Sequence, residues 1–203
     1  MEKNIISAKE ALKALMDGNK RFISDELTHP RHGGARKQEL TGGQAPFAIV
    51  LSCSDSRVDP NIAFDQGLGD LFVIRVAGNV AKDKVLGSIE YAVEHLGTKL
   101  IFVLGHEKSG AVTASMEPAV FEGHVGAIVE VIKPAVYLAR HQDGDDLENA
   151  IKNNALMVKE HITDSLPVLN RAIKEKGVEV VSGYYKLETG EVEILDKAPG
   201  FVA

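Results

Sequence analysis

The chain has 203 residues, of which 44% are hydrophobic and 26% charged, and its formal net charge is −6 at pH 7. This composition is that of an ordinary globular protein with a core of its own, and we expect a single domain over residues 1–203. The acidic balance, the aromatic content of 5% and the lack of Trp argue against a nucleic-acid partner, because phosphates need a basic face and bases need aromatic side chains to stack on.

Neither a membrane span nor a secretory leader is expected. The longest apolar runs are only as long as a strand, which is too short to cross a bilayer. The opening MEKNIISAKEALKALM contains acidic residues and lacks a continuous apolar stretch, unlike a secretory signal. The single cysteine, Cys53, cannot form an internal disulfide, and this fits a reducing, cytoplasmic location.

Two helices are predicted near the N-terminus. Residues 7–22 carry apolar side chains at helical spacing, and Ser7 with Glu10 three residues later has the pattern of a capping box. A second, short helix is predicted near residues 35–40, within a polar stretch rich in Gly and Pro. We therefore expect a helical N-terminal arm over residues 1–45.

Short apolar runs that alternate with helical segments follow the arm. Three runs are predicted as buried strands: PFAIVLS, DLFVIRVA and KLIFVLG, which begin at residues 46, 70 and 99. Helices are predicted over 86–97 (ended by Gly97), 109–117, 124–141 and 147–175, the last broken near Pro167. Asp59 before Pro60 indicates one more helix start. Residues 177–195 are predicted as two strands joined by a turn at Thr189 and Gly190.

This alternation predicts an α/β core over residues 46–203. We expect a mostly parallel central sheet with helices on both faces and an antiparallel edge strand from the final hairpin. In such sheets, ligands bind outside the carboxyl ends of the strands.

Two reactive side chains are predicted at that edge. Cys53 directly follows the first predicted strand, and His106 directly follows the third. They meet if the two strands are neighbours. A thiolate beside an imidazole indicates either a zinc site or a thiol–imidazole nucleophile.

Taken together, CSDSRVDP (53–60) and GHEKSGAV (105–112) resemble the two site motifs of the beta-class carbonic anhydrases. That family carries Cys-x-Asp-x-Arg after its first strand and His-x-x-Cys-Gly after its third. Further similar stretches are LKALMDGNKRF, QAPFAIVLSCSDSR, DLFVIRVAGN, GSIEYAVEHLG and VSGYYKLETGEVEIL. The resemblance implies a zinc enzyme that interconverts carbon dioxide and bicarbonate. It also implies a homodimer or larger homo-oligomer, with the site near the subunit interface.

The resemblance also implies roles for individual residues. Cys53 and His106 correspond to zinc ligands. Asp55 corresponds to the carboxylate that orients the reacting hydroxide, and Arg57 to the arginine that holds this carboxylate. Gln44, nine residues before the cysteine, corresponds to a glutamine on the substrate side.

The chain departs from the family pattern at Ser109, which stands where the second cysteine ligand is expected, just before the matching Gly110. A serine hydroxyl stays protonated at neutral pH and is a poor zinc donor beside thiolate or imidazole. Asp55 could complete the metal site, but it would then no longer orient the hydroxide. We therefore expect a carbonic anhydrase fold with a weakened Zn²⁺ site and impaired hydration of carbon dioxide.

Simpler interpretations remain open at this stage. Ser109 precedes an apolar helical segment, so helix capping is its simplest role. Asp55 and Arg57 could form a salt bridge within a turn, and His124 is a weak candidate for a replacement ligand. One alternative function is a metal-free family member that binds bicarbonate or another anion, or acts as a structural dimer. Another, which the flanking residues disfavour, is a thiol enzyme with Cys53 as nucleophile and His106 as base.

Overall fold

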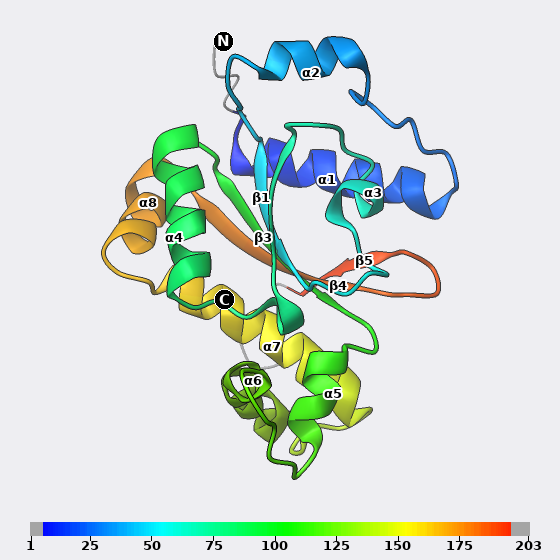
Figure 1. Ribbon diagram of the computed structural model, residues 1–203, viewed down its shortest axis with the longest axis vertical. Coiled ribbons are helices and arrows are strands. Elements are labelled where there is room, and N and C mark those ends of the chain that lie inside the picture. Colours follow the sequence, from blue (N-terminus) through cyan, green and yellow to red (C-terminus); the bar gives the residue numbers. More distant parts are fainter. Residues whose placement is uncertain (1–5, 196–203) are drawn as a thin grey trace.

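The computed structural model describes residues 6–195, which form a five-stranded sheet with helices on both faces (Figure 1). The strands are β1 (Ala48–Ser52), β2 (Leu71–Arg75), β3 (Leu100–His106), β4 (Glu179–Tyr185) and β5 (Val192–Ile194). Their order across the sheet is β2-β1-β3-β4-β5, and every neighbouring pair is parallel except β4 with β5. The predicted fold class is confirmed.

Helices occupy most of the chain between the strands. They are α1 (Ala8–Ile23), α2 (Gly34–Leu40), α3 (Pro60–Ala63), α4 (Asp83–Tyr91), α5 (Gly110–Met116), α6 (Val125–Ala139), α7 (Asp146–Thr163) and α8 (Val168–Lys176). Two short segments complete the set: a 3₁₀ turn, η1 (Ala77–Asn79), and a π-helical continuation of α4, η2 (Ala92–Leu96). Within residues 6–195, no helix is both long and apolar enough to cross a membrane.

The sheet separates two hydrophobic clusters. Along β1, Ile49 and Leu51 pack into one cluster with side chains of α4, α6, α7 and α8, whereas Ala48 and Val50 pack into the other with α1 and α3. Figure 1 shows α1 and α3 on one side of the strands and α4 and α8 on the other. Because β1 and β3 are buried on both faces, their sequences are continuous apolar runs without alternation.

Several predicted boundaries are confirmed, and two differ. The predicted break near Pro167 separates α7 from α8, and Gly97, with φ of 80°, ends the α4–η2 helix. Helix α4 begins at Asp83, three residues before the predicted start. The final connection runs from Lys186 to Glu191, so it is longer than a two-residue turn.

Helix α1 is capped at its start and is joined to the rest of the fold by Asn19. The predicted capping box is present, because the Glu10 backbone N–H donates to Ser7 Oγ (3.2 Å) and the Ser7 N–H donates to the Glu10 carboxylate (2.8 Å). Asn19 is buried and donates to the carbonyls of Ala63 and Gly190, while its own Oδ1 accepts from the Val192 N–H. One amide side chain thereby joins α1, α3 and the β4–β5 hairpin.

The segment between α1 and α2 is held by two buried carboxylates. Asp65 accepts from Arg21 Nε (2.6 Å) and from the Thr28 N–H (3.1 Å), and Asp70 accepts from Arg31 Nε (2.8 Å). Burial alone would raise the pKa of Asp65, but the contacts with Arg21 and Thr28 outweigh it and lower the pKa to about 2. Asp65 is therefore ionised at neutral pH. The boundary between arm and core at residue 45 stays a prediction.

The close approach of α1 to α3 gives a test of this packing. A Cβ built at Gly18 would lie 1.8 Å from the backbone oxygen of Phe64, so Gly18→Ala must push the two elements apart. We expect Gly18→Ala to lower the free energy of unfolding by about 3 kcal/mol. Gly87→Ala in α4 is the matched control, because a Cβ there meets nothing within 4 Å and alanine favours a helix by up to ~1 kcal/mol. Urea denaturation midpoints compare the variants, and equal midpoints would contradict the packing.

Candidate active site

The parallel pairing of β1 with β3 brings the two motif segments together. Ser52, the last residue of β1, is paired with Leu104, and β3 continues for two more residues to His106. Cys53 follows Ser52 directly, so both predicted ligands lie at the carboxyl edge of the sheet. Both side chains are buried, with Cys53 5% exposed and His106 fully covered.

The thiol of Cys53 lies in surroundings that favour its ionised form. Its sulfur accepts a hydrogen bond from the Gly78 N–H at 3.3 Å. Burial would raise the pKa of the Cys53 thiol, but the nearby His106 imidazole and the backbone N–H groups of Gly78 and Asp55 outweigh it, and the pKa is lowered. A thiolate is the form that binds a metal ion.

The Gly78 N–H approaches the Cys53 sulfur because Gly78 has a left-handed backbone conformation, which favours glycine. Its φ is 70°, and a Cβ there would lie 2.6 Å from Ile132 Cδ1. On the other side of the same residue, the Gly78 carbonyl accepts from Asn154 Nδ2 of α7 at 2.9 Å. Helix α7 thus supports the loop that supplies the hydrogen bond to Cys53.

His106 presents one free ring nitrogen. Its Nδ1 lies 2.9 Å from the Glu107 carbonyl, which can only accept, so Nδ1 carries the proton. Its Nε2 is fully buried and has no hydrogen-bond partner among residues 6–195. A buried ring nitrogen without a hydrogen-bond partner is rare in proteins. Nε2 is therefore the atom of His106 that a metal ion would bind.

Asp55 and Arg57 form the predicted dyad. Arg57 donates to both Asp55 oxygens, through Nε at 2.9 Å and Nη2 at 2.7 Å, and its backbone N–H donates to Oδ1 at 3.0 Å. These bonds hold the pKa of the Asp55 carboxyl well below its ordinary value. Arg57 Nη2 also donates to the carbonyl of Lys108 at 3.1 Å, so the guanidinium joins the loop after β1 to the loop after β3.

Ser109 is buried at the ligand position but does not cap its helix. It is 1% exposed and occupies the N-cap of α5, yet its side chain makes no capping hydrogen bond. Its Oγ has no partner among the described residues. The expectation that Ser109 acts mainly as a helix cap is therefore wrong. The hydroxyl is an orphaned polar atom on the His106 side of the site.

Cys53, His106 and Asp55 give only part of a zinc site. Two donors on one tetrahedral zinc ion lie about 3.4 Å apart, and Asp55 Oδ2 lies 3.9 Å from His106 Nε2. Both Asp55 oxygens are bonded to Arg57, however, and within residues 6–195 no group of three His, Cys, Asp or Glu side chains is arranged to hold a metal ion. Cys53 and His106 fit zinc as two strong ligands, and Asp55 becomes a third only by turning away from Arg57.

Of the remaining predicted residues, one lies near this edge and two do not. Gly110 is the first residue of α5, directly after Ser109, and a Cβ built on it would meet nothing within 4 Å. His124 is exposed at the N-cap of α6 and belongs to no metal-ligating group in the described chain.

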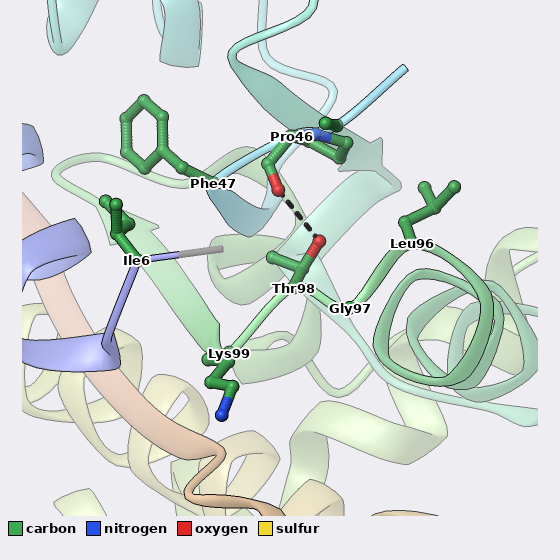
Figure 2. A pocket seen from close by; sticks show the side chains of 8 residues that line it. Ile6, Pro46, Phe47, Leu96, Gly97, Thr98 and Lys99 are labelled. Atoms are coloured by element: carbon green, nitrogen blue, oxygen red, sulfur yellow. Dashed lines mark hydrogen bonds between the residues drawn. The ribbon is translucent and has the colours of Figure 1, made fainter. Parts of the chain in front are cut away.

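Gln44 lies at the amino edge of the sheet, opposite the carboxyl edge that carries Cys53 and His106. It is exposed and precedes the amino end of β1 by four residues, whereas Cys53 follows the carboxyl end. Figure 2 shows the neighbouring Pro46 and Phe47 beside Thr98 and Lys99, which precede β3, and Thr98 Oγ1 donates to the Pro46 carbonyl at 3.0 Å. A five-residue strand spans ~17 Å, so Gln44 does not reach Cys53 within one chain.

Sequence reasoning missed three residues that shape the site. Arg75 donates to backbone carbonyls of the loop after β1, and the Asn154 amide holds Gly78. Glu107 accepts from the Leu187 N–H at 2.9 Å and so fixes the loop after β3 to the β4–β5 hairpin. These contacts involve main-chain groups of distant segments, which leave no pattern of spacing in the sequence.

Comparison with known proteins places the chain in a family. The sequence model described as carbonic anhydrase matches residues 48–192. Carbonic anhydrase 2 of Mycobacterium tuberculosis is 38% identical over 201 residues, which cover 92% of each chain. The carbonic anhydrase of Mycolicibacterium smegmatis is 51% identical over 134 residues, which span 64% of this chain and 65% of that protein.

Solved structures of beta-carbonic anhydrases share the fold of this chain. The beta-carbonic anhydrase CcaA has a TM-score of 0.71 and 28% sequence identity, covering 90% of this chain and 94% of that one. A chain from the crystal structures of two tetrameric beta-carbonic anhydrases of Sordaria macrospora shares the fold, with a TM-score of 0.72 at 24% identity, covering 92% of this chain and 97% of that one. The chain belongs to the beta class of the carbonic anhydrase family.

The dyad geometry predicts the titration of Asp55. In Arg57→Gln the pKa of the Asp55 carboxyl should rise by roughly 1–3 pH units, because the guanidinium that favours the ionised form is lost. Since the folded pKa is depressed in the wild type, the stabilisation from this pair is present above the ordinary value of about 4 and is lost as the pH falls through the folded pKa. Carboxyl carbon NMR shifts of metal-free protein measure the pKa of Asp55, and urea denaturation at a series of pH values measures the stabilisation.

Arg21→Gln is the matched control for that titration. It removes an arginine from Asp65 and leaves the Asp55 contacts in place, so the Asp55 titration should match the wild type. An Asp55 pKa that is unchanged in Arg57→Gln would show that the pair does not control this carboxyl.

Proposed function

We propose that this chain catalyses the reversible hydration of carbon dioxide to bicarbonate, with a zinc ion held by Cys53 and His106 and with activity reduced by Ser109. One observation carries the proposal. The buried, unpartnered Nε2 of His106 lies 3.9 Å from a carboxylate that Arg57 keeps ionised, in a chain of the carbonic anhydrase family. When bound, zinc supplies the Lewis acidity that makes hydroxide available from water near neutral pH.

The residues of the chain orient the reaction. An ionised Asp55 accepts a hydrogen bond from a hydroxyl group at the site, and this turns the oxygen lone pair toward the carbon of carbon dioxide. A protonated carboxyl would donate instead and turn the hydroxyl the wrong way. Arg57 therefore contributes by keeping Asp55 ionised, and its bond to the Lys108 carbonyl keeps the dyad beside His106.

Ser109 lowers the proposed activity through zinc affinity. A hydroxyl replaces a thiolate at the ligand position, so two strong protein ligands remain in place of three. Asp55 cannot serve fully as both a ligand and the group that orients the hydroxyl. We infer weaker zinc binding, and slower hydration whenever Asp55 turns to the metal.

Gln44 and Gly110 are assigned to the substrate side. The amide of Gln44 can donate to a bicarbonate oxygen without adding charge, but within one chain it lies at the opposite edge of the sheet. We infer that Gln44 acts in the site of a second copy, in a homodimer or larger homo-oligomer. The solved relatives from Sordaria macrospora are described as tetrameric. Gly110 leaves open space beside Ser109 where substrate can approach.

A second candidate function is a metal-free family member that binds bicarbonate or another anion. The observation in its favour is the lack of a three-ligand metal group among residues 6–195, together with the orphaned hydroxyl of Ser109. A hydroxyl can donate to an anion, which a thiolate cannot. Calorimetric titration of metal-free protein with bicarbonate distinguishes this function from the first.

Zinc content tests the assignment of Ser109. After dialysis against a mild chelator, we expect the wild type to retain less than one zinc ion per chain. Ser109→Cys should bind zinc roughly a hundredfold or more tightly and should hydrate carbon dioxide faster, because it restores a third strong ligand. Elemental analysis and stopped-flow hydration assays measure the two quantities.

Ser115→Cys is the matched control for that experiment. Ser115 is a buried serine within α5 that donates to the Ala111 carbonyl and does not occupy the ligand position. Its substitution should leave zinc affinity unchanged. An unchanged affinity in Ser109→Cys would overturn the assignment of Ser109, and equally tight zinc in the wild type would overturn the proposed impairment.

Complementation between copies tests the role of Gln44. In Cys53→Ala every site lacks a ligand, and in Gln44→Ala every site lacks the amide. In a mixed dimer of the two variants, one site receives both an intact ligand set and a partner's Gln44. We therefore expect co-refolding to restore roughly a quarter of the wild-type hydration rate: half of the dimers are mixed, and half of their sites are complete. No gain over the separate variants would contradict a role between subunits.

A further inference from the structure

Arg75, the last residue of β2, makes three hydrogen bonds to one loop. Its Nε donates to the Cys53 carbonyl at 3.0 Å, and its Nη2 donates to the carbonyls of Asp55 (2.7 Å) and Val58 (2.9 Å). The remaining terminal nitrogen, Nη1, lies 3.6 Å from the Asp59 carboxylate. Within the described chain, the guanidinium is thus directed at the backbone of residues 53–59.

Among residues 6–195, this loop has no strand partner. The pairing of β1 with β2 ends at Ser52 and Arg75, and one further backbone bond, from the Val76 N–H to the Ser52 carbonyl, closes the ladder. Beyond that point the chain turns away from the sheet. The carbonyls of Cys53, Asp55 and Val58 accept from the guanidinium instead of from a neighbouring strand, and the Asp55 carbonyl also accepts from the Val58 N–H within the loop.

Arginine is suited to this position in a way that lysine is not. A guanidinium offers five N–H donors in a planar fork, so it can satisfy carbonyls of three residues at once, whereas a single ammonium group cannot match the same fixed directions. A hydrogen bond that involves a charged group is also stronger than one between neutral groups.

The loop that Arg75 holds carries half of the site. Cys53 and Asp55 lie within it, and Arg57 of the same loop bonds both to Asp55 and to the Lys108 carbonyl beside His106. A shift of this loop would therefore move the thiol and the dyad together, relative to the imidazole at the end of β3.

We propose that Arg75 is the positioning residue of this site: by bonding the carbonyls of Cys53, Asp55 and Val58, it fixes the loop that presents the thiol and the Asp55–Arg57 dyad toward His106. The consequence for metal binding rests on the proposed function, whereas the fixing of the loop does not. A direct measurement of how firmly the loop is held therefore tests the role of Arg75 separately from the proposed function.

Hydrogen exchange of single amides provides that measurement, on the full chain without added metal. The reporters are the amides of Arg57 and Val58, which are bonded inside the loop to Asp55 at 3.0 and 3.1 Å. In Arg75→Ala their exchange should be about tenfold faster or more, with β3 amides unchanged. Arg75→Lys should show a smaller increase, and it serves as the test if Arg75→Ala does not fold.

Asp59→Asn is the matched control. It removes the charge opposite Arg75 but leaves the three carbonyl bonds, and asparagine still caps α3 in place of aspartate. Exchange at Arg57 and Val58 should match the wild type. Loop amides that exchange at the wild-type rate in both Arg75 variants would overturn the proposal, as would an equal acceleration in the β3 amides, because that would show a general loss of stability.

Chemical rescue and cobalt binding complete the test. Ethylguanidinium, added to Arg75→Ala far below denaturing concentrations, should slow exchange at Arg57 and Val58 toward the wild-type rate. A failure of rescue would show that the donors of the side chain are not what holds the loop. Cobalt(II) titration, followed by the absorption of the metal–thiolate bond, should show at least about tenfold weaker binding in Arg75→Ala.

If the wild type binds no cobalt, the proposed function fails, and the exchange rates still decide the role of Arg75. If the wild type binds cobalt and Arg75→Ala binds it equally well with a mobile loop, the positioning role is overturned while the proposed function stands.

Discussion

The parallel pairing of β1 with β3 determines where every reactive group of the site lies. The register that sets Ser52 beside Leu104 places Cys53 at the carboxyl edge, and the two extra residues of β3 bring His106 there. Both strands are buried on both faces, so a slip of one residue would exchange the side chains of the two hydrophobic clusters. The same packing that stabilises the sheet therefore also fixes the distance between thiol and imidazole.

Around these two strands, the site is held mainly by bonds to the backbone. Arg57 bonds the Lys108 carbonyl, Asn154 bonds the Gly78 carbonyl, and Glu107 bonds the Leu187 N–H. Each contact joins a loop at the carboxyl edge to a different part of the chain. A ligand set built in this way keeps its geometry only while the surrounding loops are in place, and this explains why the Arg75 contacts bear on the thiol as well as on the loop.

Much of this arrangement follows from the sequence, because periodicity and strand ends carry it. Continuous apolar runs predict the buried strands β1 and β3, and the residues that follow them predict Cys53 and His106 at one edge. The prediction of a buried strand is wrong for β2, which lies at the edge of the sheet and is only half-buried. The sequence does not predict Arg75, because its partners are carbonyls that every residue type has. It misleads at Ser109, where a position before a helix suggests a cap although the hydroxyl makes no hydrogen bond to the helix amides. The family resemblance assigns Gln44 and Cys53 to one site, although the strand predicted from residue 46 already separates them along the chain.

The three hydrogen bonds of Asn19 have a consequence for biosynthesis. The Asn19 amide needs the Gly190 carbonyl and the Val192 N–H, which lie 171 and 173 residues further along the chain. During translation, α1 therefore emerges long before the hairpin that completes its contacts. Until then the apolar face of α1, with Ala11 and Leu15, has only a partly formed sheet to cover it. The nascent chain must keep this helix from other apolar surfaces until β5 has left the ribosome.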